Sequence, residues 1–168
     1  MFTLLTPENL PATLTAVSLI ITAVGGVVLY RVQKEPPKAG SQDAAAVALA
    51  QAGVTLDDLS FVETHDCFTI AELLEYEAMG LTKEGDGARA IKEGWTQKDG
   101  KLPVNVSGGL KAKGHPIGAT GVSMHVLTAM QVRGEAGGMQ VEGARLGGVY
   151  NMGGACVASY VSILEPLR

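Results

Sequence analysis

The feature that most constrains this chain is a stretch over 111–121, Lys-Ala-Lys-Gly-His-Pro-Ile-Gly-Ala-Thr-Gly, in which a histidine lies between a glycine and a proline. The glycines let the backbone approach a ligand closely, and Pro116 fixes its own φ angle and has no N–H. An apolar helical pattern follows over 122–132. We therefore expect His115 in a loop that leads into a helix N-terminus, where negative charge is favoured. This stretch alone leaves open a glycine-rich turn with an exposed histidine.

Two further motifs lie on either side of this stretch. His65-Asp66-Cys67-Phe68 follows a strand-like run over 59–64, and Asn-Met-Gly-Gly-Ala occupies 151–155. In this order the three motifs resemble the C-terminal part of a thiolase. They are most similar to the sterol-carrier-protein-like and lipid-transfer branch, which has HDCF where ordinary thiolases have NEAF. The resemblance runs from about Gln42 to Pro166, and its most specific piece is SGGLKAKGHPIGATG.

The resemblance implies catalytic roles for four residues. His115 would activate a nucleophilic cysteine and help to bind the thioester oxygen. Cys67 would be the acid/base group for the second substrate, His65 would replace an asparagine that helps to hold an oxyanion, and Gly153 would supply a backbone N–H. These are the groups that thioester exchange needs. A coenzyme A thioester is the substrate that this implies, with no covalently bound cofactor.

Two departures from the family pattern matter. Ordinary thiolases have a cysteine at the start of the last turn, where this chain has Asn151, which agrees with the HDCF branch. The nucleophilic cysteine belongs to an N-terminal half that has no counterpart in these 168 residues. Cys67 beside His65 is an alternative nucleophile with a lowered pKa, but the resemblance favours proton transfer at this position.

An uncharged run near the N-terminus predicts a membrane anchor. No charged residue occurs from Asn9 to Tyr30, which is long enough to span a bilayer, and Arg31 and Lys34 follow. The positive-inside rule then places the C-terminal domain on the cytoplasmic side of the membrane. A buried core helix is the alternative.

The expected fold class is α/β, the C-terminal half of a thiolase-like fold with the order β-α-β-α-β-β, preceded by a single N-terminal transmembrane helix. Three regions follow from this: an anchor over 1–34 with its span at about 10–30, a linker over 35–41, and a thiolase-like domain over 42–168. The elements expected in that domain are helices over 42–52, 69–80, 88–94 and 122–132, and strands over 59–64, 104–106, 144–151 and 155–164. For the helix after HDCF we expect Thr69 as N-cap, and Ile70, Leu73, Leu74 and Ala78 as its apolar face.

Other candidate residues carry weaker signals. Lys111 and Lys113 are candidates for contact with a coenzyme A phosphate, although solvated loop lysines fit equally. Asp66 would either orient His65 or cap the following helix. His125 lies inside the apolar helical pattern and is interpreted as a packed helix residue, because no second ligand has suitable metal-binding spacing. We therefore predict no metal site.

Composition and the motifs leave two functions open. The net charge of −4 and the lack of a basic tract argue against nucleic-acid binding. The first hypothesis is a membrane-anchored, non-catalytic thiolase-like half-domain that serves as an accessory or interaction subunit of a larger membrane complex. The alternative is an acyl-CoA acyltransferase half that needs a separate N-terminal half carrying the nucleophile. Both predict a protein partner or a second copy, because a half-fold leaves apolar surface uncovered.

Overall fold

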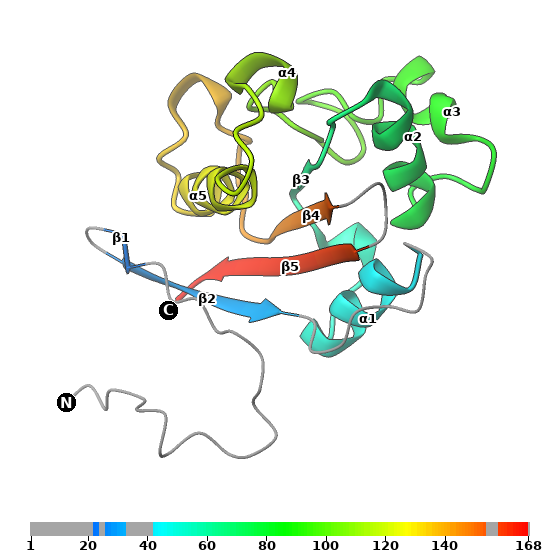
Figure 1. The fold of residues 1–168 in the computed structure, drawn as a ribbon. Coiled ribbons are helices and arrows are strands. Elements are labelled where there is room, and N and C mark those ends of the chain that lie inside the picture. The colour runs from blue at the N-terminus through cyan, green and yellow to red at the C-terminus, as the bar shows by residue number, and fades with distance from the viewer. Residues whose placement is uncertain (1–21, 24–25, 33–41, 154–157, 168) are drawn as a thin grey trace.

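A five-stranded mixed sheet forms the centre of the computed structural model, which describes residues 22–23, 26–32, 42–153 and 158–167 (Figure 1). The strand order is β1-β2-β5-β4-β3. The strands are β1 (Thr22–Ala23), β2 (Gly26–Val32), β3 (Phe61–Thr64), β4 (Gly147–Gly153) and β5 (Ala158–Pro166). β3 and β4 run parallel, and the other neighbours are antiparallel.

Helices cover both faces of this sheet. The two helices in direct contact with it are α1 (Gln42–Ala52) and α5 (Thr120–Val132). Because side chains alternate along a strand, Tyr150 of β4 packs in the cluster that contains the alanines of α1, whereas Val149 packs with Met124 of α5. α1 and α5 therefore lie on opposite sides of the sheet, as Figure 1 shows.

Five shorter helical segments complete the described fold. They are η1 (Leu56–Asp58), α2 (Thr69–Ala78), α3 (Gly87–Lys92), α4 (Gly109–Lys113) and η2 (Gly137–Met139). The sequence prediction missed α4, because its glycine start and its lysines resemble a loop. Because α4 takes up part of the expected loop, the loop that remains between α4 and α5 is shorter. It still carries His115.

The predicted apolar face of α2 is wrong in part. Ile70 is 61% exposed and Leu74 is 46% exposed, whereas Tyr76 is buried in the main core cluster. A buried tyrosine removes more apolar area from water than an aliphatic side chain, so the helix turns this face inward. Phe68, and not Thr69, occupies the N-cap position, and it makes no capping hydrogen bond through its side chain.

The predicted transmembrane helix over about 10–30 is wrong where the structure describes the chain. Residues 22–23 and 26–32 are strands, and β2 pairs with β5 in register from Val28↔Pro166 to Val32↔Ser162. A β-branched pair, Val27 and Val28, favours a strand, and β5 offers an edge on which it can pair. Within the described residues, no helix is both long and apolar enough to cross a bilayer. Residues 10–21 and the predicted linker 35–41 lie outside the described residues.

The predicted strand over 104–106 is reduced to a single bridge, Val62↔Val104. Asn105 ends it, because this residue has a positive φ of 50°. Its side chain continues the pairing instead: Oδ1 accepts the Thr64 N–H at 2.8 Å, and Nδ2 donates to Thr64 Oγ1 at 2.9 Å. The two C-terminal strands begin three residues later than predicted, and Gly154, Ala155 and Cys156 fall outside the described residues.

Candidate functional site

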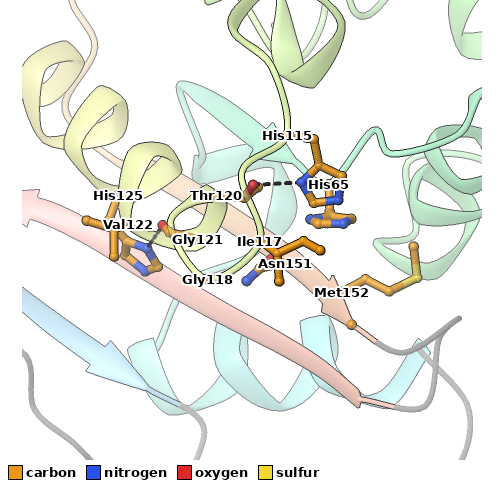
Figure 2. A pocket seen from close by; sticks show the side chains of 11 residues that line it. His65, His115, Ile117, Gly118, Thr120, Gly121, Val122, His125, Asn151 and Met152 are labelled. Atoms are coloured by element: carbon orange, nitrogen blue, oxygen red, sulfur yellow. Dashed lines mark hydrogen bonds between the residues drawn. The ribbon is translucent and has the colours of Figure 1, made fainter.

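A pocket of about 480 Å³ opens where the His115 loop and α5 face the end of β4 (Figure 2). Its polar lining comes from four segments: the turn after β3, the loop before α5, α5 itself, and β4. The residues that line it are His65, His115, Ile117, Gly118, Thr120, Gly121, Val122, His125, Asn151, Met152 and Gly153. Three of the four predicted catalytic residues, His65, His115 and Gly153, are therefore brought together.

The side chain of His115 is held in one tautomer by Thr120. His115 Nδ1 lies 2.7 Å from Thr120 Oγ1, and the Thr120 hydroxyl donates its one hydrogen to the Pro116 carbonyl at 3.0 Å. We assign the hydroxyl oxygen as the acceptor in its contact with His115 and therefore place the imidazole proton on Nδ1. Nε2 keeps its lone pair, as a general base requires. Thr120 begins α5 and is buried, which fixes this arrangement.

His65 is buried beside His115. The two ring centroids are 4.8 Å apart, and the rings meet edge to face at 81°. Burial lowers the pKa of His65, and charge on His115 lowers it further, while the nearby Asn151 side chain and the charge of Asp66 oppose the change. Neutral His65 is thereby favoured, and a neutral imidazole can donate one hydrogen bond to an oxyanion.

Asn151 and Gly153 bring the end of β4 to the pocket. A Cβ atom on Gly121 would lie 2.9 Å from Asn151 Nδ2, so the first turn of α5 approaches Asn151 closely because residue 121 is glycine. Asn151 Oδ1 is buried and has no hydrogen-bond partner among the described residues. Gly153 lies at the exposed end of the strand.

Cys67 is the predicted catalytic residue that does not line the pocket. It is half-buried, and its N–H donates to the His65 carbonyl at 2.8 Å in the turn that follows β3. This hydrogen bond holds the backbone of Cys67 close to that of His65. It does not put Cys67 among the groups that face the pocket.

The two lysines before His115 form ion pairs within the chain. Lys113 Nζ lies 3.3 Å from Glu63 Oε2, and Lys111 Nζ lies 2.9 Å from Glu72 Oε2 and 3.6 Å from Asp66 Oδ2. Their predicted contact with a coenzyme A phosphate stays a prediction. Asp66 does not cap α2, whose N-cap is Phe68; its Oδ1 accepts the Leu110 N–H of α4 at 2.7 Å instead. Its predicted role in orienting His65 stays a prediction.

His125 lines the pocket from α5, at a distance from the pair formed by His65 and His115 in Figure 2. Its Nδ1 lies 2.6 Å from the Gly121 carbonyl, and its Nε2 lies 3.2 Å from Ser162 Oγ on β5. Burial lowers its pKa. The interpretation of His125 as a packed helix residue is confirmed by these contacts, although its position on the pocket wall was not expected.

A buried carboxyl group lies behind the same turn. Glu75 of α2 is 2% exposed, and neither carboxyl oxygen has a hydrogen-bond partner of standard length among the described residues. Burial raises its pKa to about 9, helped by the charges of Glu72 and Asp66, while donors on the His65 backbone and the Thr64 side chain oppose the rise. Glu75 is therefore neutral near pH 7. Sequence analysis missed it, because helix periodicity does not distinguish a buried glutamate from an exposed one.

The chemistry available at this pocket is acid/base catalysis and oxyanion binding. His115 offers a base, and His65 and the Gly153 backbone offer groups for a developing negative charge. No cysteine or serine is among the lining residues that the structure describes, and the Thr120 hydroxyl is already engaged. The described lining thus offers a base and groups for an oxyanion, but no thiol and no serine hydroxyl.

Known proteins resemble this chain in sequence and in fold. Residues 31–166 match a family model described as thiolase C-terminal domain-like. An acetyl-CoA acetyltransferase from Methanothermobacter thermautotrophicus is 49% identical over 123 residues, which are 73% of this chain and 32% of the relative. Human sterol carrier protein 2 is 45% identical over 113 residues, 67% of this chain and 21% of that protein. The chain thus matches a third or less of the length of these relatives.

A solved structure gives the same fold. A chain of the Ltp2-ChsH2(DUF35) aldolase superposes with a TM-score of 0.66 at 23% sequence identity. The superposition covers 76% of the present chain and 32% of that chain.

Proposed function

Because this chain belongs to the thiolase C-terminal domain-like family, we propose that it supplies the acid/base and oxyanion-binding half of an acyl-CoA acyltransferase site. The observation that carries the proposal is the shared pocket of His65, His115 and Gly153, whose described lining residues include no cysteine or serine. A second polypeptide segment with a nucleophilic cysteine would complete the site. The substrate would be a coenzyme A thioester.

The geometry supports a site that is shared between this chain and a second polypeptide segment. Nε2 of His115 keeps its lone pair and belongs to an exposed side chain at the pocket, so a cysteine that enters from outside can give up its proton there. Ile117 is 98% exposed and Val122 is 53% exposed beside the pocket. Exposed apolar side chains around a polar centre suit a protein partner better than water.

Complementation tests the proposal directly. The full chain is mixed or co-expressed with the part of the Methanothermobacter acetyl-CoA acetyltransferase that has no counterpart here, and coenzyme A-dependent cleavage of a 3-ketoacyl-CoA is measured. We expect activity only when both parts are present, and a loss of about 10²-fold or more with His115→Ala. Activity of this chain alone that disappears with Cys67→Ala would instead make Cys67 the nucleophile.

A non-catalytic accessory subunit is the second candidate. It is favoured by the position of Cys67, which does not face the pocket in the described structure. A complex that forms with the complementary half but gives no turnover, with no effect of His115→Ala on its stability, would support this function.

Attachment to a membrane, with the C-terminal domain on the cytoplasmic side, stays a prediction from the uncharged run that begins at Asn9. The measurement is carbonate extraction of membranes from cells that express the full chain. Retention in the pellet supports an anchor, and complete release argues against one.

A further inference from the structure

The position of His115 depends on a helix that is too short to be stable by itself. α4 comprises only Gly109–Lys113 and is separated from His115 by Gly114. Helices of this length do not persist in water without tertiary contacts. The contacts that hold α4 therefore also decide where the His115 ring lies.

Glu63 holds the C-terminal end of α4. Its Oε2 atom lies 3.3 Å from Lys113 Nζ and accepts the Ser107 hydroxyl at 2.8 Å. Glu63 is 1% exposed, and burial raises its pKa, while Lys113 and Ser107 lower it. A carboxylate this deeply buried depends on its cationic partner, so the pair resists separation.

Asp66 holds the N-terminal end of the same helix. Its Oδ1 accepts the Leu110 N–H at 2.7 Å, and its side chain is 3% exposed. A Cβ atom on Gly109 would lie 2.2 Å from Asp66 Oδ2, and Gly109 has a φ of 63°. Only glycine fits here, so the carboxylate and the helix start are tightly packed.

We propose that Glu63 and Asp66 are positioning residues that hold both ends of α4 and thereby set the His115 ring against His65. His65 lies between Glu63 and Asp66 in the chain. The short segment 63–66 therefore carries the His65 ring and also the two carboxylates that position the His115 ring. The two ring centroids lie 4.8 Å apart, and loss of either anchor would move α4 and separate them. The consequence for catalysis rests on the proposed function, but the positioning itself does not.

Nuclear magnetic resonance of the full chain tests the proposal without any assay of activity. The chain has three histidines, so their ring signals can be assigned individually. We expect Glu63→Gln and Lys113→Met each to weaken the nuclear Overhauser effect between the His65 and His115 rings and to shift the His115 signals. The signals of His125 should stay in place, because its partners are in α5 and β5.

Two controls separate positioning from general loss of stability. Lys113→Arg keeps the cation and should keep the contact between the rings. Glu135→Gln also removes a carboxylate from an ion pair, with Arg133 beyond the end of α5, and should leave all three histidines unchanged. If either Glu63→Gln or Lys113→Met does not fold, the ring contact in the other variant tests the proposal.

An unchanged ring contact in a folded Glu63→Gln or Lys113→Met variant would overturn the proposal. In the complemented enzyme, both variants should lower kcat with little effect on KM. Absence of activity in the wild-type mixture would count against the proposed function and would leave the ring contact as the test of this inference.

Discussion

Thr120 is the contact on which the assigned tautomer of His115 depends. With the Thr120 hydroxyl hydrogen assigned to the Pro116 carbonyl, its oxygen accepts from Nδ1. We expect Thr120→Val to remove this acceptor and to populate the tautomer with the proton on Nε2, so that Nε2 can no longer accept a proton from a nucleophile. Imidazole ¹⁵N chemical shifts measure the tautomer, and the complemented activity should fall by about 10²-fold. Thr120→Ser keeps the hydroxyl and should change neither the tautomer nor the complemented activity. Equal ¹⁵N chemical shifts in the Val and Ser variants would contradict this role.

Glu75 makes the stability of the chain depend on pH. Its pKa rises to about 9 in the folded protein, so between roughly pH 4.5 and 9 the folded state holds a proton that the unfolded state releases. This contribution therefore destabilises the fold progressively as the pH rises through that window. Glu75→Gln removes the ionisation, and we expect it to raise the free energy of unfolding at pH 8 by at least ~1 kcal/mol with little change at pH 4.5. Urea denaturation at both values measures this, and a difference that does not depend on pH would show that Glu75 is not a buried acid.

Helix α5 has one face toward the sheet and one toward the pocket side. Met124 is fully buried, whereas Val122 is 53% exposed and Val126 is 41% exposed. We expect Val122→Lys and Val126→Lys to leave the unfolding of the isolated chain nearly unchanged, but to abolish complementation, because their surface would meet the partner half. Met124→Ala should lower stability by about 2–5 kcal/mol. Complementation that survives both lysine variants would place the partner on another surface.

The sequence predicted those elements whose pattern depends on local chemistry. The strand before HDCF and the helix after the His115 loop are present because β-branched and apolar residues recur at the right period over 59–64 and 122–132. The sequence did not predict the elements that depend on tertiary contacts, which are α4 and β2. α4 exists because Glu63 and Asp66 hold it, and β2 pairs with an edge that only the folded chain presents. In the site, the motifs identified His65, His115 and Gly153. Thr120 lies inside the most specific motif, but its role depends on its contacts with His115 and Pro116, and Glu75 carries no signal until its neighbours are known.

At the scale of the whole molecule, β2 extends the sheet beyond β5. Deleting residues 1–41 would remove β1 and β2 and leave β5 as an open edge, which favours aggregation. Deleting only residues 1–21 keeps both strands and is the matched control. We expect the longer deletion to lower Tm by several degrees or more and to promote self-association, as measured by calorimetry and sedimentation. Identical melting and sedimentation of the two truncated chains would show that β2 contributes nothing to the fold.

The most direct measurement of the central claim is acylation of the partner's cysteine. The complementary half of the archaeal relative is mixed with an acyl-CoA and with this chain, and the acylated cysteine peptide is quantified over time by mass spectrometry. Rapid acylation is expected with the wild-type chain, and slow acylation with His115→Ala or with no added chain. Acylation at the same rate in all three mixtures would contradict the claim that this chain supplies the base for a nucleophile on another polypeptide.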